Sequence, residues 1–202
     1  MGYPVESNMP TNIEMKAVLT NRAATEAAAA RLSDIGPETI HQADFFFHSD
    51  QSRLKLRVFA GDRGELIRYE RTDVPDVRGS HYLIARTSDP QILLEILQAA
   101  LGSTGVVKKT RTLYLIGQTR VHIDDVNGLG EFLELEVVLR EGQSEAEGKK
   151  IANALLAEVG IGKEQLLAEA YVDLLARRTN AAGAQKAAAA AASPIANRDS
   201  NG

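Results

Sequence analysis

The sequence has no cysteine, and this absence excludes disulfide bonds, thiolate catalysis and cysteine-ligated zinc together. It has no apolar run near the ~20 residues that a helix needs to cross a bilayer. Residues 1–10 also lack a basic segment followed by an apolar one, which is the pattern of a secretory signal. We therefore expect a cytoplasmic protein that does not act on membranes.

Several common catalytic motifs are also missing. There is no Gly-x-x-x-x-Gly-Lys-Ser/Thr phosphate loop, no Gly-x-Ser-x-Gly nucleophile elbow and no His-Glu-x-x-His zinc helix. The 4 histidines are scattered, which argues against a zinc site. The net charge of -4 disfavours nucleic acid as the main partner, because proteins that bind phosphate backbones are usually basic.

The length and composition of the chain favour one domain. Of its 202 residues 44% are hydrophobic, which is enough for a sizeable core. We expect this domain to span residues 10–178, after a flexible N-terminal segment of residues 1–9. From residue 179 the chain is rich in alanine and then polar, with no large apolar side chain that could dock. We expect residues 179–202 to form a disordered tail.

The middle of the chain alternates apolar and polar residues, which is the pattern of half-buried β-strands. The pair Asn127-Gly128 between two such runs is a strong signal for a hairpin turn. Many antiparallel strands with a few helices indicate an α+β domain. We expect strands at Asn12–Leu19, Arg53–Phe59, Glu65–Arg71, Ser80–Ala85, Lys109–Ile116, Thr119–Val126 and Glu131–Leu139, and helices at Arg22–Leu32, Pro90–Leu101, Ser144–Val159 and Lys163–Arg177.

The polar faces of these strands carry charges that are sorted by sign. Residues two apart on a strand point the same way, so Arg53, Lys55 and Arg57 share one face, and Glu134 and Glu136 share another. A half-solvated sheet with its charged face in water is one interpretation. However, like charges on one strand repel each other and gain little at an open surface. A sheet rolled into a barrel could instead surround one cavity with basic residues for phosphate and carboxylates for divalent cations.

Three motifs follow one another along the chain. The first is Asn12-Ile13-Glu14-Met15-Lys16, and the second is Arg53-Leu54-Lys55-Leu56-Arg57. The third and most specific runs through Lys109-Thr110-Arg111, Tyr114, Arg120-Val121-His122-Ile123-Asp124-Asp125-Val126, Gly128-Leu129-Gly130-Glu131-Phe132 and Glu134-Leu135-Glu136. Together they resemble the CYTH superfamily of triphosphate tunnel metalloenzymes, which includes class IV adenylyl cyclases, thiamine triphosphatases and inorganic triphosphatases. The resemblance spans about Pro10 to Arg177, is strongest to the cyclase-like branch, and implies a closed, largely eight-stranded antiparallel β-barrel with helices packed outside.

The resemblance also implies roles for individual residues. The carboxylates that would coordinate Mg²⁺ or Mn²⁺ are Glu14, Asp124, Glu134 and Glu136. The cations that would hold the triphosphate are Lys16, Arg53, Lys55, Arg57, Arg71, Lys109, Arg111 and Arg120, and we expect Lys16, Lys109 and Arg111 to take part in catalysis. For Arg53 and Arg71 a solvated surface charge is an equally good interpretation.

Three other features receive weaker interpretations. His122 shares a face with Arg120 and Asp124, and we expect it to be a structural histidine, although a part in proton transfer stays open. Phe45–Phe47 are expected in the barrel wall, with Asp44 turned inward. The first glutamate of the family's Glu-x-Glu-x-Lys motif is Asn12 here, and its neutral side chain would weaken or reshape one metal site.

The resemblance leaves the reaction open. Attack by the ribose hydroxyl of ATP would make the protein an adenylyl cyclase that releases pyrophosphate, and the third motif favours this reaction. Attack by water would make it a triphosphatase acting on thiamine triphosphate, tripolyphosphate or a nucleoside triphosphate. A non-catalytic module that binds polyphosphate or a nucleotide is the third hypothesis, and a homodimer is possible in each case.

Overall fold

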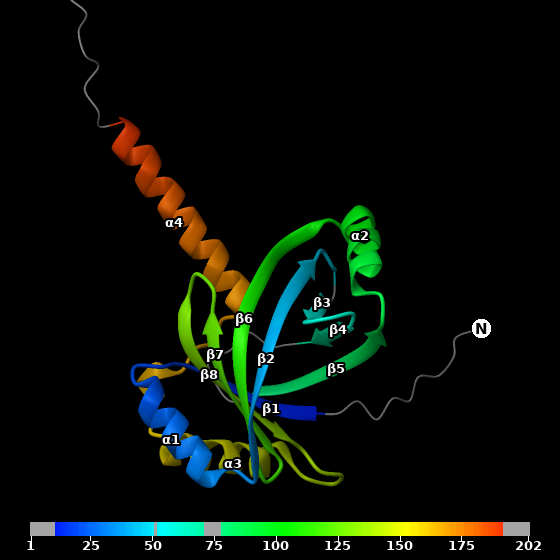
Figure 1. Ribbon diagram of the computed structural model, residues 1–202. Coiled ribbons are helices and arrows are strands. Elements are labelled where there is room, and N and C mark those ends of the chain that lie inside the picture. The colour runs from blue at the N-terminus through cyan, green and yellow to red at the C-terminus, as the bar shows by residue number, and fades with distance from the viewer. Residues whose placement is uncertain (1–10, 51, 71–77, 192–202) are drawn as a thin grey trace, which may run out of the picture.

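The computed structural model describes residues 11–50, 52–70 and 78–191. Its strands form a closed antiparallel barrel in the order β1-β5-β4-β3-β2-β6-β7-β8 (Figure 1). The strands are β1 (Thr11–Val18), β2 (Ile35–Phe47), β3 (Arg53–Phe59), β4 (Gly64–Glu70), β5 (Arg78–Thr87), β6 (Ser103–Ile116), β7 (Thr119–Val126) and β8 (Gly130–Val138). The helices are α1 (Arg22–Leu32), α2 (Pro90–Leu101), α3 (Glu145–Glu158), the 3-10 turn η1 (Lys163–Gln165) and α4 (Tyr171–Ala191). The predicted α+β class and eight-stranded barrel are confirmed.

The alternation along β1 shows how the sequence makes the two faces of the barrel wall. Ile13, Met15 and Ala17 are buried on the outer face, in an apolar core. Glu14 and Lys16 lie on the other face, along the cavity inside the barrel. Because β1 pairs with β8 on one side and β5 on the other, this strand closes the barrel.

The predicted hairpin at Asn127-Gly128 joins β7 to β8. Gly128 and Gly130 have φ angles of +80° and +111°, which residues with a side chain rarely adopt. The turn therefore depends on these glycines. It sets the register in which His122 lies opposite Glu134, so both side chains point into the barrel.

Helices α1 and α3 lie together against the outside of the barrel in Figure 1, and the main core is between them and the wall. α3 begins with a capping box, in which the Ser144 side chain accepts from the Glu147 N–H and the Glu147 carboxylate accepts from the Ser144 N–H. The core is formed by buried residues of the wall and of both helices: Ile13, Met15, Ala17, Leu19, Ala29, Tyr114, Val121, Ile123, Leu133, Leu135, Val137, Ala152, Leu155, Leu156, Val159 and Ile161.

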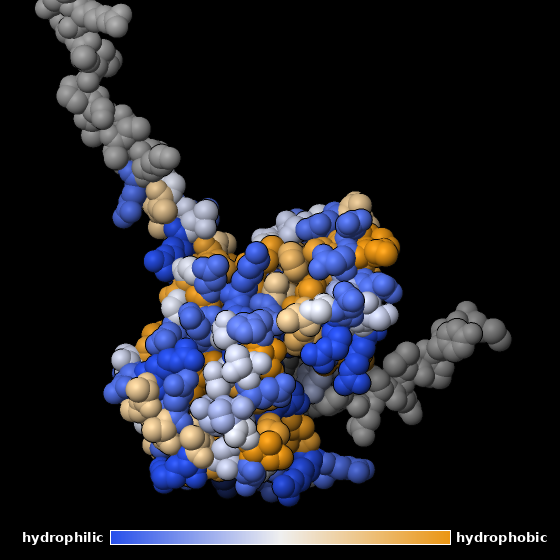
Figure 2. Space-filling view, in the orientation of Figure 1, coloured by the Kyte–Doolittle hydropathy of each residue, from blue (hydrophilic) through white to orange (hydrophobic). Residues whose placement is uncertain are grey.

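Helix α2 packs on the barrel with one face only. Pro90 occupies its first turn, and Asp89 is the N-cap residue but makes no side-chain capping bond. Leu94 is buried against Leu56 and Phe47. The opposite face is exposed and includes apolar residues of the helix, and Figure 2 shows hydrophobic side chains gathered there.

The structure corrects the prediction at the end of the chain. The helix predicted at Lys163–Arg177 has wrong bounds, because residues 163–165 form a 3-10 turn and the next helix begins only at Tyr171. α4 then continues to Ala191, where we expected a tail without structure, and it projects away from the barrel in Figure 1. The helix propensity of alanine accounts for this continuation, although the side chains of residues 179–185 are exposed.

The limits of the predicted domain remain a prediction, because residues 1–10 and 192–202 lie outside the described residues. Among the helices that the structure describes, none has the length and apolar character needed to span a membrane.

Candidate functional site

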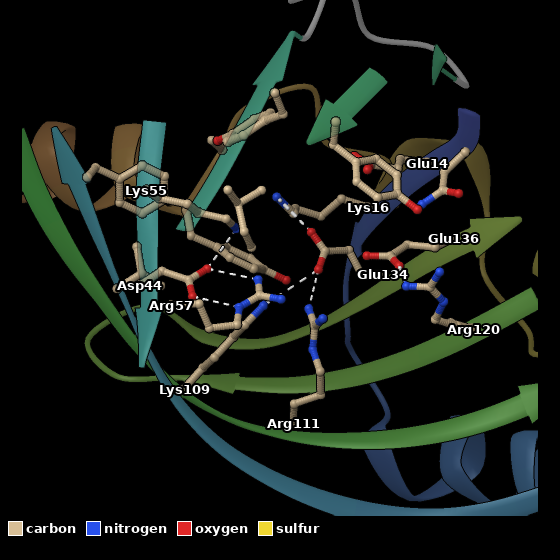
Figure 3. A pocket seen from close by; sticks show the side chains of 18 of the residues that line it. Glu14, Lys16, Asp44, Lys55, Arg57, Lys109, Arg111, Arg120, Glu134 and Glu136 are labelled. Carbon is tan, nitrogen blue, oxygen red and sulfur yellow. Dashed lines mark hydrogen bonds and ion pairs between the residues drawn. The ribbon is translucent and has the colours of Figure 1, made fainter. Parts of the chain in front are cut away.

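The inner faces of the barrel strands surround a cavity lined by charged side chains from six strands. Figure 3 shows them pointing toward one another, with Asp44, Lys55 and Arg57 on one side and Glu134, Glu136 and Arg120 on the other. The polar residues along the cavity are Asn12, Glu14, Lys16, Asp44, Lys55, Arg57, Tyr69, Tyr82, Lys109, Arg111, Arg120, Glu134, Glu136 and Tyr171. The sorted charges of the strands therefore face inward, and the interpretation as a solvated sheet is wrong for most of them.

Asp44 of β2 holds two cations of the neighbouring strand β3. Arg57 donates from Nε to Oδ1 at 2.8 Å and from its terminal nitrogen to Oδ2 at 3.0 Å, and Lys55 donates to Oδ2 at 2.8 Å. Burial alone would raise the pKa of Asp44, but the charges of Arg57 and Lys55 outweigh it and hold the pKa well below its usual value. Burial and the nearby Arg57 lower the pKa of Lys55. Asp44 is thus ionised and orients both cations.

Asp124 has the corresponding role for the cations of β6. Its side chain is fully buried and accepts from Lys109 at 2.7 Å and from Arg111 at 2.6 and 2.7 Å. The Tyr171 hydroxyl, from the start of α4, donates a further bond at 3.1 Å. Burial would lower the pKa of Arg111, but the adjacent Asp124 carboxylate raises it well above its usual value. Arg111 is therefore permanently charged and fixed in direction.

Glu134 and Glu136 form the acidic side of the cavity. Glu134 pairs with Arg111 and lies 3.4 Å from the Lys16 amine and 3.6 Å from the Lys109 amine. Glu136 pairs with Arg120 at 3.2 Å. Burial would raise the pKa of Glu134, but the charges of Lys109, Lys16 and Arg111 outweigh it and hold the pKa well below its usual value. Both carboxylates are ionised and offer oxygen atoms to the cavity.

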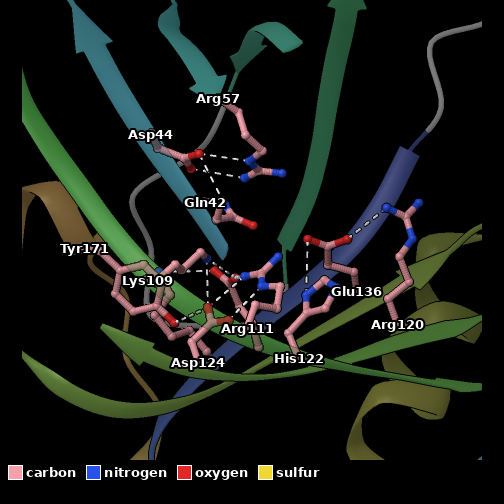
Figure 4. Close-up of polar contacts among 12 residues, drawn as sticks. Gln42, Asp44, Arg57, Lys109, Arg111, Arg120, His122, Asp124, Glu136 and Tyr171 are labelled. Atoms are coloured by element: carbon pink, nitrogen blue, oxygen red, sulfur yellow. Dashed lines mark hydrogen bonds and ion pairs between the residues drawn. The ribbon is translucent and has the colours of Figure 1, made fainter. Parts of the chain in front are cut away.

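His122 lies beside these two carboxylates with its Nδ1 3.7 Å from Glu136 Oε1 (Figure 4). Burial and the charge of Arg111 lower the pKa of this histidine to about 3, so its imidazole is neutral at pH 7. Atoms of His122, Glu134 and Glu136 that could bind a metal lie within 4.8 Å of one another. These three residues fit a small divalent cation in chemistry and in spacing.

Asn12 also offers an oxygen atom that fits a cation. Its side chain lines the cavity, is 3% exposed, and its Oδ1 has no hydrogen-bond partner among the described residues. A buried carbonyl oxygen without a partner costs free energy unless a ligand or water satisfies it. The substitution of the expected glutamate therefore removes a charge but keeps a ligand atom.

One part of the cavity wall is apolar and aromatic. Tyr69, Tyr82 and Ile84 line it on β4 and β5, together with Phe46 of β2. The Lys55 amine lies 5.5 Å from the centre of the Tyr69 ring and 5.7 Å from that of Phe46. Phosphate would not contact such a wall favourably, whereas an organic group attached to phosphate could pack on it.

The predicted site residues are brought together with three exceptions. Arg53 and Asp124 are not among the described residues that line the cavity. Arg53 instead pairs with Asp173 of α4 at 2.9 Å, and Asp124 lies behind the cavity, where its oxygens accept from Lys109 and Arg111. Arg71 lies outside the described residues. The roles of all these residues in binding and catalysis remain predictions.

Sequence reasoning missed Tyr171. Its ring lies under two cations of the cavity, 3.9 Å from the Lys16 amine and 4.9 Å from the Lys109 amine. Burial, followed by the charges of Glu134 and Asp124, raises the pKa of this tyrosine well above its usual value, so it stays a neutral donor. Tyr171 lies at the start of a helix, 47 residues from Asp124, so no short-range pattern in the sequence predicts their hydrogen bond.

The sequence matches the CYTH domain family over residues 10–171. No curated protein matches the chain.

Solved structures from several organisms share this fold. The PH1012 protein of Pyrococcus horikoshii superimposes with a TM-score of 0.73 at 23% identity, over 81% of this chain and 99% of that one. A candidate adenylate cyclase of Vibrio parahaemolyticus gives 0.70 at 16% identity, over 84% and 99%. HpAC1 of Hippeastrum, proposed as an adenylyl cyclase and described as having a dominant triphosphatase activity, gives 0.59 at 17%, over 84% and 96%. At such identities the likeness shows a shared fold.

Proposed function

Since this chain belongs to the CYTH domain family, we propose that it is a divalent-metal-dependent enzyme that acts on a triphosphate carrying an organic group. One observation carries the proposal. Cations from four strands and carboxylates from three converge on a single cavity beside an apolar wall. Burying so many charged groups costs free energy of desolvation, and only a charged ligand compensates for that cost. A site for a neutral ligand would therefore not contain them.

The cations are proposed to bind the phosphate oxygens. Arginine can make bidentate contacts to phosphate, and lysine acts as a compact charge. Asp44 and Asp124 fix the directions of their cations before a substrate arrives, which lowers the entropy lost on binding. The proposed binding residues are Lys16, Lys55, Arg57, Lys109, Arg111 and Arg120, with Arg53 and Arg71 as further predictions.

The carboxylates Glu14, Glu134 and Glu136 are proposed to hold a divalent cation, aided by the oxygen of Asn12. A divalent ion bound there would offset the charge of the triphosphate and polarise its phosphorus–oxygen bonds. Asp124, which we also predicted as a ligand, is better explained as a positioning residue, because its oxygens already accept from Lys109, Arg111 and Tyr171.

The protein's own contribution to the reaction is positioning and charge stabilisation. Lys16, Lys109 and Arg111 lie around Glu134 at one point of the cavity, where they would stabilise charge that develops on the reacting phosphate. We infer that a cyclase reaction is the first candidate, as the third sequence motif favours, with ATP adenine packed on the aromatic wall. Hydrolysis of thiamine triphosphate or another organic triphosphate uses the same wall and is the second candidate.

A product assay on the purified protein distinguishes these reactions. ATP, thiamine triphosphate and tripolyphosphate would each be supplied with Mg²⁺ or Mn²⁺, and cyclic AMP, pyrophosphate and phosphate would be measured. Cyclic AMP with pyrophosphate supports the cyclase, and phosphate without cyclic AMP supports the triphosphatase. Equal turnover of tripolyphosphate would contradict the role of the apolar wall.

A variant of Glu136 separates an enzyme from a binding module. Glu136→Gln keeps the shape of the side chain but removes its charge. We expect turnover to fall at least about 100-fold while the affinity for a non-hydrolysable triphosphate changes only a few-fold. Glu158→Gln, at an exposed position on α3, serves as the control. If wild-type protein binds triphosphates tightly but converts none of them, the binding module is the better account.

A further inference from the structure

The neutral His122 imidazole has a nitrogen with an unusual environment. The side chain is 4% exposed, and Nδ1 has no hydrogen-bond partner among the described residues. Its nearest carboxylate atom is Glu136 Oε1 at 3.7 Å, which is too long for a hydrogen bond. Figure 4 shows the ring directed toward Glu136. A buried polar atom without a hydrogen bond costs free energy, and this nitrogen is available to a ligand.

We propose that His122 Nδ1 is a ligand of the divalent cation, together with one oxygen each of Glu134 and Glu136. The resulting nitrogen and oxygen site would favour Mn²⁺ or Co²⁺ over Mg²⁺. This inference deepens the proposed function and rests on it only for the presence of a divalent ion beside these carboxylates. It replaces our expectation that His122 is a structural histidine.

The spacing of the three side chains supports one shared ion. Their potential ligand atoms lie within 4.8 Å of one another, a span that an ion with bonds of ~2.0–2.3 Å bridges after small side-chain rotations. The register of the hairpin explains this proximity, because His122 lies directly opposite Glu134 and Glu136 is two residues further along the same strand. All three residues lie on paired strands rather than on a loop, so the spacing is rigid.

The surrounding charges determine what the site accepts. Arg111 pairs with Glu134, and Arg120 pairs with Glu136, so each carboxylate already has a cationic partner. The Lys16 and Lys109 amines also lie 3.4 and 3.6 Å from Glu134, so a further positive side chain would add repulsion, whereas a neutral imidazole adds a ligand without adding charge. The ion itself is then balanced by the carboxylates and by the negative phosphate oxygens.

Ligand chemistry gives the preference between metals. Mg²⁺ takes oxygen ligands almost exclusively, while imidazole nitrogen suits transition metals. Asn12 keeps an oxygen atom but removes one carboxylate charge relative to the family motif, which weakens the binding of Mg²⁺ by oxygen ligands alone. The histidine nitrogen and the lost carboxylate charge both favour a transition metal over Mg²⁺.

Pulsed electron paramagnetic resonance of the full-length, tag-free protein with bound Mn²⁺ tests the proposal without any substitution. We expect hyperfine coupling to a histidine nitrogen, which changes when histidine alone is labelled with ¹⁵N. A spectrum with only water and carboxylate signals would overturn the inference, even if the protein turns over a triphosphate. Nitrogen coupling in a protein without turnover would support the inference and contradict the proposed function.

Metal affinities of one variant provide a second test. His122→Phe keeps a planar buried ring but has no ligand atom, and His48→Phe changes an exposed histidine as the control. We expect the Mn²⁺ and Co²⁺ affinities of His122→Phe to fall at least about tenfold and the Mg²⁺ affinity to fall less than about threefold. Equal losses for all three metals, or none, would contradict a nitrogen ligand. Circular dichroism and the thermal midpoint establish that the variant is folded, and the spectrum of the unsubstituted protein decides the question if it is not.

Discussion

Arg57 donates two parallel hydrogen bonds to Asp44, of 2.8 and 3.0 Å, across adjacent strands of the barrel wall. The Asp44 side chain is 5% exposed and the Arg57 side chain 17%, so the pair is largely removed from water but open to the cavity on one side. A bidentate pair of this kind fixes the direction of the arginine. The remaining terminal nitrogen of Arg57 can then face the cavity without a search through other rotamers.

Replacing Asp44 by asparagine tests whether this carboxylate stabilises the fold. Asp44→Asn leaves Lys55 and Arg57 close together without a compensating charge. We expect the free energy of unfolding at pH 7 to fall by about 2–4 kcal/mol, less than for a fully enclosed pair because both cations retain some solvent. Urea unfolding measures this loss. Asp62→Asn, at an exposed position, should change the value by less than about 0.5 kcal/mol.

The same pair predicts how stability depends on pH. The pKa of Asp44 is lowered in the folded protein, so the unfolded chain takes up a proton at higher pH than the folded one. The stabilisation by Asp44 is therefore complete above about pH 4 and is lost as the pH falls through the folded pKa. Unfolding curves at pH 7, 5, 4, 3 and 2 should show the wild type and Asp44→Asn converging only below pH 4. A constant difference down to pH 2 would contradict this explanation.

Asp124 and Asp125 are neighbours in sequence with opposite environments. Asp124 is fully buried between Lys109, Arg111 and Tyr171, whereas Asp125 is exposed on the outer face. We expect Asp124→Asn to lower the free energy of unfolding by about 3–5 kcal/mol, and Asp125→Asn to leave it nearly unchanged. Chemical denaturation of both variants gives the comparison. A small effect of Asp124→Asn on stability would show that the fold does not depend on the contacts of Asp124 with Lys109 and Arg111.

Much of the barrel was predictable because its strands obey a simple rule. Strands such as β1 and β3 alternate between an apolar outer face and a charged inner face. The bounds predicted for Arg53–Phe59 and Thr119–Val126 agree with β3 and β7. β2 was missed over most of its length. It contains Gly36 and Pro37, which are typical of turns, and it pairs with β6 through two irregularities that interrupt the period.

The site was predictable where its residues share a strand and not where they meet across the fold. Glu134 and Glu136 are two apart, so their common face follows from the sequence. Asp124 and Tyr171 belong to different elements, and their contact depends on the position of α4 against the barrel. The same limit applies to Arg53, whose side chain forms an ion pair with Asp173 of that helix and does not line the cavity. The alternation and the motifs of a sequence show on which face of a strand a residue lies. They do not show which residue of another element it contacts.

The contact of Tyr171 with Asp124 can be separated from the packing of its ring. Tyr171→Phe removes the hydroxyl that donates at 3.1 Å but keeps the ring beneath Lys16 and Lys109. We expect a loss of about 1–2 kcal/mol in the free energy of unfolding, whereas Tyr171→Ala should cost about 3–5 kcal/mol. Thermal and urea unfolding of the two variants measure these values. Equal losses would mean that the hydroxyl carries the whole effect and the ring carries none.

Two glycines in helices predict opposite results for the same substitution. A Cβ atom on Gly148 of α3 would lie 2.5 Å from Leu139 Cδ2 and 2.7 Å from Ile13 Cγ1 of β1, closer than real Cβ contacts, so these side chains or the helix itself would have to shift. We expect Gly148→Ala to lower the free energy of unfolding by about 1–3 kcal/mol, despite the better helix propensity of alanine.

Gly183 of α4 is the matched control, because no described atom outside its own stretch of helix would lie within 4 Å of an added Cβ. Gly183→Ala should leave the free energy of unfolding unchanged or raise it by less than about 1 kcal/mol, since only the propensity term acts there. Circular dichroism with urea unfolding would measure both variants. If Gly148→Ala were as stable as Gly183→Ala, the close approach of α3 to β1 would not be a constraint on the fold, and helix position would be set by the larger apolar side chains alone.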